Sequence, residues 1–323
     1  MNNIICIAGP TASGKTALAA TLAKELNGEV VSCDSMQVYK RMDIGTAKPT
    51  LEEMQGIPHH MIDVAEPWED FSVSRYCDMA APIVDDILSR GKTAVIAGGT
   101  GLYMDSLIRG NAFAPFPATG VRERLEAQAD TVGMEAMLSQ LRSVDPDAAG
   151  RLHLSDRKRI LRALEVYLET GETITEHNRK TQAVPPRYSP IWLGLDFAQR
   201  GELYRRIDLR VSLMLQQGLV EEIQGLLADD LKVIRPTIMM SVPRIYEKVY
   251  DKIQDTLVKK PAFVQKLFHT AVDLVRQSSR RYAKRQLTWF RRNKAIHWLI
   301  REAGDTGREI LENARRIVSD FDN

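Results

Sequence analysis

Short apolar runs separated by a helical pattern open the chain. Residues 4–8, 29–33 and 93–97 each have the length of one buried strand and end at polar or turn-forming residues. Residues 17–26 follow the first run and are rich in Ala and Leu, which favour a helix. Strands that alternate with helices are typical of a parallel sheet with helices on both faces. The pattern therefore predicts an α/β fold for the first third of the chain.

Strand-like runs are absent between residues 111 and 186, where helical periodicity dominates. Residues 111–120 contain two prolines and are interpreted as a linker. Ser155 is a candidate N-cap and Gly171 a candidate helix stop. The predicted helices cover residues 121–128, 133–144 and 156–170. This part of the chain is expected to form a small all-helical insertion domain.

The α/β pattern returns after the insertion. Residues 191–195 form another apolar run, and residues 202–227 have the pattern of one long helix. Both fit a three-layer core with a parallel sheet. The predicted boundaries assign residues 1–114 and 187–323 to this core and residues 115–186 to the helical insertion.

A glycine-rich segment lies between the first predicted strand and the first predicted helix. It fits G-x-x-x-x-G-K-[ST] and consists of Gly9, Pro10, Thr11, Ala12, Ser13, Gly14, Lys15 and Thr16. In such a P-loop, backbone N–H groups and the helix N-terminus form a nest for phosphate. Lys15 is expected on the outer phosphates and the Thr16 hydroxyl on a Mg²⁺ ion. The core is therefore predicted to bind a polyphosphate, with the reaction left open.

Polar residues follow the other two early strands. Asp34 comes directly after the second strand, and Thr100 lies in a glycine-rich turn after the third. Ligands of open parallel sheets bind at the carboxyl ends of strands, so both residues should share a site with the P-loop. An acid, a hydroxyl and a phosphate nest suit group transfer. One interpretation is a small-molecule kinase, in which ATP fills the nest and Asp34 deprotonates a hydroxyl.

Composition indicates an ordinary globular protein. The 323 residues are 44% apolar and 27% charged, which allows a sizeable core. Cys6, Cys33 and Cys77 form no C-x-x-C pair, so neither a disulfide framework nor a zinc site is predicted. The adjacent His59 and His60 would point to opposite sides of an extended segment, which favours a structural role. With no basic-then-apolar leader and no apolar run of about 18 residues, we expect a cytoplasmic protein.

Basic residues are concentrated in two places. Residues 274–301 contain no Asp or Glu. Their basic residues are Arg276, Arg280, Arg281, Lys284, Arg285, Arg291, Arg292, Lys294 and Arg301. A second basic face is predicted on the helix that carries Arg157, Lys158, Arg159 and Arg162. A single-sign block favours a polyanion such as nucleic acid as partner, although a basic surface helix without a partner is the alternative.

Seven blocks, in order, resemble the tRNA dimethylallyltransferase family, the isopentenyltransferases of tRNA. The resemblance covers residues 1–228 and 276–323. Its blocks are residues 9–16, 34–39, 43–49, 58–63, 97–103, 157–167 and 282–289. It implies transfer of a dimethylallyl group from dimethylallyl diphosphate to N6 of the adenosine immediately 3′ of a tRNA anticodon. It also implies that the protein uses Mg²⁺ and binds tRNA. We further expect a monomer.

The resemblance assigns roles to individual residues. Asp34 matches the general base that accepts the N6 proton, and Thr100 matches a residue that touches the target base. The P-loop would hold the diphosphate, together with Arg206 and Arg210. Ser35, Met36 and Gln37, with Asp34, match a segment that holds the flipped-out nucleotide. The other matched tRNA contacts are Arg122, Lys158, Arg159, Ile160, Leu161, Arg162, Lys284, Arg285, Gln286, Trp289 and Arg291. Trp289 could instead anchor the basic helix to the core.

Residues 231–275 depart from the family pattern. Within them, residues 235–252 and 263–273 are similar to an internal fragment of long-chain acyl-CoA ligases, whose AMP-binding loop is absent here. A fused gene product and an unusual divergence are the two explanations. Helices are expected over residues 242–256 and 262–274. Because the apolar side chains of such a segment were not selected to pack on this core, we expect a destabilised or weakly active transferase. A kinase and a non-catalytic RNA-binding product are the alternative functions.

Overall fold

The computed structural model describes residues 3–111, 119–230, 261–302, 304–305 and 307–322. The chain divides into two compact units. One unit comprises Met1–Gly110 and Arg187–Asn323, and the other comprises Asn111–Pro186.

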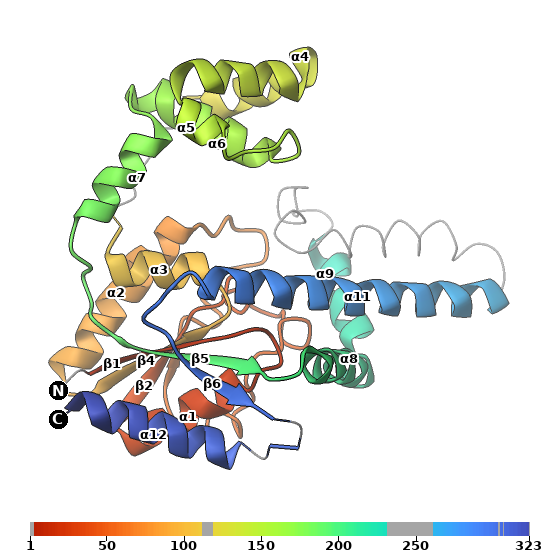
Figure 1. The fold of residues 1–323 in the computed structure, drawn as a ribbon. Coiled ribbons are helices and arrows are strands. Elements are labelled where there is room, and N and C mark those ends of the chain that lie inside the picture. The colour runs from red at the N-terminus through yellow and green to blue at the C-terminus, as the bar shows by residue number, and fades with distance from the viewer. Residues whose placement is uncertain (1–2, 112–118, 231–260, 303, 306, 323) are drawn as a thin grey trace. The chain divides into compact units, whose positions relative to one another are not determined.

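A six-stranded sheet, parallel throughout, forms the centre of the first unit (Figure 1). The strands lie in the order β3-β2-β4-β1-β5-β6. Their bounds are β1 Ile4–Ala8, β2 Gly28–Ser32, β3 His59–His60, β4 Thr93–Gly98, β5 Ile191–Phe197 and β6 His297–Arg301. Every residue of β1, β2 and β5 is buried, as expected for strands covered on both faces. The predicted α/β fold with a parallel sheet is confirmed.

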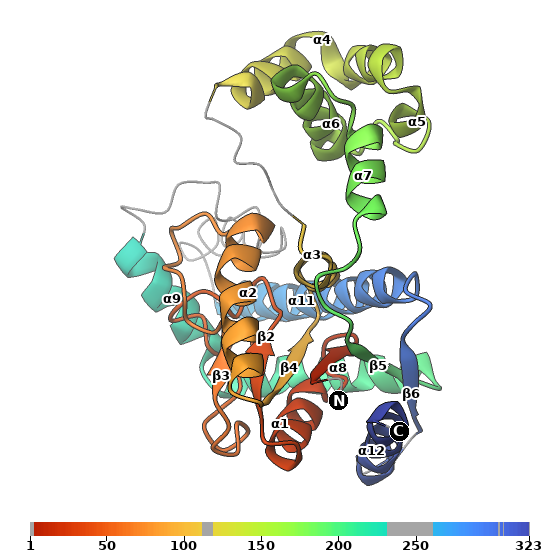
Figure 2. The same cartoon turned by 90° about the vertical axis from the view of Figure 1, so that its left-hand side faces the viewer.

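Helices cover both faces of this sheet. Figures 1 and 2 show α1 and α12 on one face and α2, α3 and α11 on the other. On the first of these faces, side chains such as Leu22, Val95 and Ala314 share one hydrophobic core. The helices of this unit are α1 Lys15–Glu25, α2 Val73–Ser89, α3 Gly101–Arg109, α8 Arg200–Gln216, α9 Leu219–Asp230, α11 Pro261–Phe290 and α12 Arg308–Asp322.

The expected single helix over residues 202–227 is wrong. The chain forms α8 and α9 instead, separated at Gly218, whose φ of 99° is left-handed. A residue in this conformation cannot continue a right-handed helix, and glycine adopts it without steric cost. The helix predicted over 262–274 is part of the 30-residue α11. The helix predicted over 242–256 lies outside the described residues.

Two strands, β3 and β6, were not predicted from the hydrophobic pattern. β3 has only two residues, both histidines, and β6 has the sequence HWLIR with one buried residue, Leu299. Neither is an apolar run, because both lie at the edges of the sheet. β6 nevertheless matters for the site, because its carboxyl end lies beside that of β5, with Phe197 opposite Arg301.

The described elements of the second unit are all helices, with a core of their own. Leu125, Met137, Leu141, Ile160 and Leu164 are among its buried members. The helices are α4 Val121–Val144, α5 Pro146–Ala149, α6 Arg157–Thr170 and α7 Ile174–Ala183. α4 contains both helices predicted there, joined across a kink at Gly133 with φ 82° and ψ 164°. α6 ends at Gly171 as predicted, but its N-cap is Asp156 and not Ser155. None of the helices described here or above is long and apolar enough to cross a bilayer.

Candidate functional site

The P-loop connects β1 to α1 through a backbone shape that its sequence favours. Gly14 is the N-cap of α1 and has a left-handed φ of 92°. Ala12 also has a positive φ of 62°, which is rare for a residue with a side chain. The first turn of α1 contains no acidic residue, so its N-terminal N–H groups remain suited to an anion. Ser13 is buried, and its Oγ has no hydrogen-bond partner among the described residues. These features fit a diphosphate.

Lys15 closes onto this loop. Its ammonium Nζ donates a hydrogen bond of 2.7 Å to the carbonyl oxygen of Pro10. The pKa of Lys15 is lowered to about 7, chiefly by burial; the charge of Asp34 opposes this shift and the charge of Arg210 adds to it. Asp34 is therefore within electrostatic reach of Lys15, as the positions of their strands predicted.

Three arginines hold consecutive residues of the P-loop. Arg210 Nη1 donates to Thr11 Oγ1 at 3.1 Å, and Arg206 Nε donates to the Ala12 carbonyl at 3.0 Å. From the end of β6, Arg301 Nη1 donates to the Ser13 carbonyl at 2.9 Å. The sequence pointed to the two arginines of α8 but not to Arg301. The missed signal is positional, since Arg301 ends a strand that the hydrophobic pattern did not reveal.

Asp34 and Thr100 lie at the carboxyl ends of the paired strands β2 and β4. Asp34 Oδ1 accepts a hydrogen bond of 2.9 Å from the backbone N–H of Met36. Thr100 Oγ1 accepts one of 3.0 Å from the N–H of Ser35. The two segments are also tied through the backbone, because Thr100 N–H donates to the Cys33 carbonyl at 3.2 Å. The predicted acid and hydroxyl are thus brought together.

Gln37 connects this acid to the loop that follows. Its Nε2 donates to the Ala47 carbonyl at 3.1 Å, and its Oε1 accepts from Ser32 Oγ at 3.1 Å. Its backbone N–H also points to Asp34 Oδ1, at 3.4 Å. Every polar group of the Gln37 side chain is therefore held by the protein.

Helix α11 reaches the same region with two side chains that were expected on tRNA. Gln286 is buried, accepts from the N–H of Thr11 at 2.8 Å and donates to the Gly99 carbonyl at 3.0 Å. Trp289 Nε1 donates to Asp105 at 2.8 Å. A Cβ on Gly101 would lie 2.0 Å from the Trp289 ring, so the ring packs directly on α3. Both side chains anchor α11 to the core, and their predicted tRNA contact stays a prediction.

Tyr282 is a site residue that sequence reasoning missed. It lies one turn before Gln286 on α11, and burial together with the charge of Asp34 raises the pKa of its hydroxyl. Thr100 and Gln286 also act on this hydroxyl and oppose that shift. The phenol therefore stays neutral beside Asp34. The basic stretch itself gave no indication that an uncharged residue within it would face the acid.

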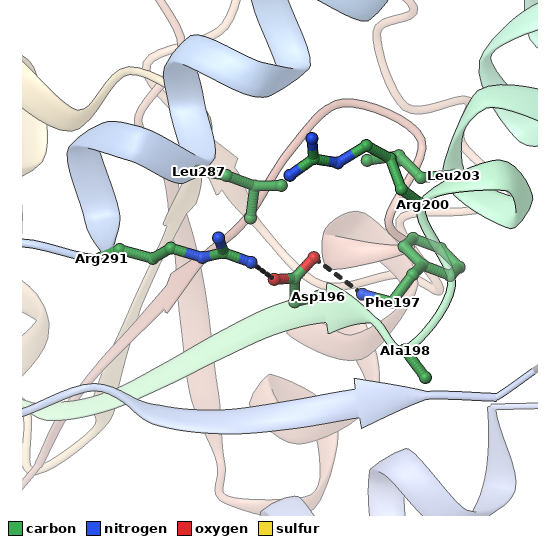
Figure 3. Close-up of a pocket in the computed structure, with 7 residues that line it drawn as sticks. All are labelled: Asp196, Phe197, Ala198, Arg200, Leu203, Leu287 and Arg291. Carbon is green, nitrogen blue, oxygen red and sulfur yellow. Dashed lines mark hydrogen bonds and ion pairs between the residues drawn. The ribbon is translucent and has the colours of Figure 1, made fainter.

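The basic residues at the C-terminal end of α11 differ in their partners. Lys284, Arg285 and Arg291 are all exposed, and Arg291, just after the helix, forms an ion pair of 2.7 Å with the buried Asp196. Figure 3 shows this pair in a pocket of about 370 Å³ at the end of β5. Its lining residues are Asp196, Phe197, Ala198, Arg200, Leu203, Leu287 and Arg291. Neither Asp34, Thr100 nor any P-loop residue lines it, so this pocket is separate from the predicted chemistry.

In the helical unit, the predicted basic face is only partly exposed. Arg122 pairs with Glu126 and Glu165 across α4 and α6, and Arg162 also pairs with Glu165. Lys158 and Arg159 are exposed. In contrast, Ile160 and Leu161 have 0% and 1% of their surface exposed and pack in the core of this unit. These two side chains follow three basic residues and bury the inner face of α6, and the expected tRNA contact of this run stays a prediction.

The site offers few ligands to a metal ion. The described residues contain no group of three His, Cys, Asp or Glu side chains that could hold one. Mg²⁺ is commonly bound by one or two protein ligands plus phosphate oxygens, which fits the half-buried Thr16 at the start of α1. His59 and His60 bind the Ile57 carbonyl and the Glu29 carboxylate respectively, each at 2.8 Å. Each histidine is thus held by a hydrogen bond within the protein, as a structural role predicts.

Known proteins resemble this chain over nearly its whole length. Residues 37–293 match the family described as IPP transferase. A tRNA dimethylallyltransferase of Acetivibrio thermocellus is 40% identical over 322 residues, which are 99% of each chain. One of Caldanaerobacter subterraneus is 42% identical over 313 residues, 96% of this chain and 95% of the relative. The family match extends across residues 231–275, and the ligase resemblance of that segment stays a prediction.

Solved structures agree with the sequence relatives. The tRNA isopentenylpyrophosphate transferase of Bacillus halodurans has a TM-score of 0.68 at 37% identity, with 99% of this chain and 96% of that chain covered. A eukaryotic dimethylallyltransferase acting on tRNA has a TM-score of 0.79 at 27% identity, with 99% and 79% covered. The chain therefore belongs to the IPP transferase family, the family of the tRNA dimethylallyltransferases.

Proposed function

We propose that this chain, as a monomer, transfers a dimethylallyl group from dimethylallyl diphosphate to N6 of the adenosine immediately 3′ of a tRNA anticodon. The observation that carries the proposal is the meeting of the P-loop, Asp34 and Thr100 at one edge of the sheet. The relatives, which are named for this activity, support it.

The reaction exchanges one bond for another. A bond forms between N6 and the allylic carbon while the bond from that carbon to the diphosphate oxygen breaks. The N6 proton passes to the carboxylate of Asp34, and diphosphate leaves with the bonding electron pair. Asp34 suits this role because Met36 N–H holds one of its oxygens in place. Ser35, Met36 and Gln37 would surround the flipped-out nucleotide.

The leaving group develops negative charge, which the P-loop would offset. Lys15, Arg206 and Arg210 supply positive charge around backbone N–H groups that are already oriented. Thr16 would hold Mg²⁺, which neutralises diphosphate charge when it is bound. Because Lys15 approaches its neutral form in the unliganded site, diphosphate binding should draw a proton onto it.

Exposed lysine and arginine side chains would provide the affinity for RNA. Four basic side chains are exposed and would contact phosphates: Lys158, Arg159, Lys284 and Arg285. Arg122, Arg162 and Arg291 would contribute from positions where each also pairs with a carboxylate. Such contacts provide affinity that falls with salt and carry little sequence choice.

One assay tests the proposal. Unmodified tRNA is incubated with labelled dimethylallyl diphosphate, and the chain is incubated in parallel with ATP and small hydroxyl acceptors. We expect label in tRNA, lost on Asp34→Ala. ATP turnover without label in tRNA would indicate the kinase, and tRNA retention with neither activity would indicate a non-catalytic RNA-binding product.

Residues 231–275 enter the proposal through their similarity to an acyl-CoA ligase fragment. Residues 261–275 of this segment are the first half of α11, whose second half carries Gln286 to the P-loop, so a poor fit would weaken the site from a distance. We expect a higher melting temperature and faster turnover after replacement by the corresponding segment of a relative. Equal values in both chains would show that the segment does no harm.

A further inference from the structure

A carboxylate of α9 occupies a nest of three backbone N–H groups. Glu222 Oε2 accepts hydrogen bonds from Asp43 N–H at 2.7 Å and Ile44 N–H at 2.6 Å. Glu222 Oε1 accepts a third from Gly45 N–H at 2.9 Å. Consecutive N–H groups that converge on one point form an anion site. Their hydrogen bonds to a charged acceptor are stronger than those to a neutral one. Glu222 therefore fixes the backbone of residues 43–45 at both of its carboxylate oxygens.

The loop that Glu222 holds is strained. Arg41 and Ala47, on either side of the nest, have φ values of 64° and 48°. Residues with side chains reach this left-handed region at a cost and stay there only when surrounding contacts impose it. Lys48 supplies part of that restraint, since its buried ammonium bonds the Tyr39 carbonyl and pairs with Asp43. Glu222 adds a further restraint from an element 177 to 179 positions away.

The far side of the same loop holds Gln37. The Ala47 carbonyl accepts from Gln37 Nε2, and the backbone N–H of Gln37 points to Asp34 Oδ1. A continuous set of contacts thus runs from Glu222 through the loop to Gln37 and Asp34. A change at Glu222 would release the loop carbonyl that orients the Gln37 amide. No step of the reaction itself requires Glu222, which does not contact the P-loop in any described bond.

We propose that Glu222 is a positioning residue for the acceptor nucleotide, acting through the 43–47 loop on Gln37 and Asp34. The proposal rests on the proposed tRNA prenyl transfer. It places the control of nucleotide geometry on α9, outside the strand ends that carry the chemistry. Figure 2 shows α9 at the edge of the unit, beside the loops that follow β2.

Glu222→Gln tests this arrangement with little change in shape. The amide presents an NH₂ group where one carboxylate oxygen accepted, so at least one backbone N–H loses its partner. We expect kcat/KM for tRNA to fall about tenfold, since a hydrogen bond to a charged acceptor contributes enough for such a factor. The KM for dimethylallyl diphosphate should stay within about twofold, because the P-loop keeps its own contacts. Glu221→Gln, the exposed neighbour on the same helix, is the matched control and should change neither value.

Two further measurements separate positioning from plain stabilisation. Hydrogen exchange of the Asp43, Ile44 and Gly45 amides should accelerate in Glu222→Gln while the amides of α9 stay protected. In a double-mutant cycle, Gln37→Ala and Glu222→Gln should be non-additive in kcat/KM for tRNA, although the two side chains do not share a hydrogen bond. Glu222→Asp keeps the charge and is the variant of choice if Glu222→Gln does not fold. It should show a smaller loss of the same kind.

The outcomes distinguish this proposal from the proposed function. If the unaltered chain transfers the dimethylallyl group and both Glu222→Gln and Glu222→Asp do so equally well, only the positioning role is overturned. Additive effects in the cycle, or equal losses for both substrates, would also overturn it and leave Glu222 as a structural residue. Absence of any transfer by the unaltered chain would overturn the proposed function, and the positioning role with it.

Discussion

Gln286 accepts a hydrogen bond from the backbone N–H of Thr11 at 2.8 Å, although 275 positions separate the two residues. The same side chain donates to the Gly99 carbonyl, so one buried amide joins the P-loop to the end of β4. The P-loop of this chain is therefore held by α11 as well as by its own sequence.

Replacement of Gln286 by Leu should weaken diphosphate binding. The substitution keeps the volume but leaves Thr11 N–H and Gly99 C=O without partners, at a cost of about 1–3 kcal/mol each. We expect the KM for dimethylallyl diphosphate to rise about tenfold in steady-state assays. Gln277→Leu, at an exposed position of the same helix, is the control and should match the unaltered chain. An unchanged KM in Gln286→Leu would mean that the loop holds its shape alone.

Asp34→Asn should abolish most of the chemistry and leave the fold intact. The side-chain amide oxygen can still accept from Met36 N–H, but it has no basicity to take the N6 proton. General-base catalysis contributes about 10²–10⁴-fold, so kcat should fall by at least about 10². Melting temperature and tRNA retention on filters should not change. Turnover within twofold of the unaltered chain would remove Asp34 from the role of base.

Diphosphate binding should take up a proton near neutral pH. Since burial lowers the pKa of Lys15 to about 7, the Lys15 side chain is uncharged in a large fraction of the unliganded molecules at pH 7 and above. A bound anion favours the ammonium, so affinity should fall as pH rises above about 7. Calorimetry of inorganic diphosphate binding at pH 8, in buffers of different ionisation enthalpy, measures the uptake. Lys15→Met should remove it.

The same lowered pKa makes Lys15 a burden on the unliganded fold. Its folded pKa lies below the unfolded value of 10.5, so the penalty is complete below about pH 7 and disappears as pH rises toward 10.5. Lys15→Met should therefore melt higher than the unaltered chain at pH 7, with the difference shrinking at higher pH. A difference independent of pH would contradict the lowered pKa.

Glu29 should control acid stability. It is buried at the start of β2 and binds Arg90, Lys92 and His60 at 2.5–2.9 Å. The hydrogen bonds from Arg90, followed by Lys92 and His60, hold the pKa of Glu29 well below its usual value. Stability from this group is therefore complete above pH 4.5 and is lost as pH falls through the folded pKa.

Substitution makes the Glu29 contribution measurable. Glu29→Gln leaves three cations around a neutral side chain and should cost about 3 kcal/mol in urea unfolding at pH 7. Glu25→Gln breaks a surface pair with Arg315 and should cost less than about 1 kcal/mol. Equal costs for the two variants would show that the burial of Glu29 adds nothing.

Local chemistry made the early part of this site predictable. The P-loop, Asp34 and Thr100 each follow an apolar strand, so parallel pairing alone brings them to one edge. Tertiary packing brings Gln286, Arg301 and Tyr282 to that edge, and it brings Glu222 to the 43–45 loop. The spacing of these residues in the sequence has no regular period from which this packing could be predicted. The break at Gly218 was missed for a similar reason, because a glycine within a helical pattern is often tolerated.

Buried and exposed residues of one helix also proved hard to separate in advance. Ile160 and Leu161 sit between basic neighbours and share their matched block, but they face the core of the helical unit. A contiguous run of residues on a helix always spans more than one face. A match to a family block therefore predicts which helix or loop contacts a ligand, but it does not predict which of its side chains make the contact.

The ribosome releases the P-loop long before it releases the residues that hold it. Gln286 and Arg301 bond Thr11 and Ser13, and at 5–20 residues per second they emerge roughly 15–60 s after the loop. A nascent chain carries the phosphate-binding motif throughout this interval without its finished support. Products of premature termination would keep the motif and lack the site, so substrate capture becomes a property of the completed polypeptide.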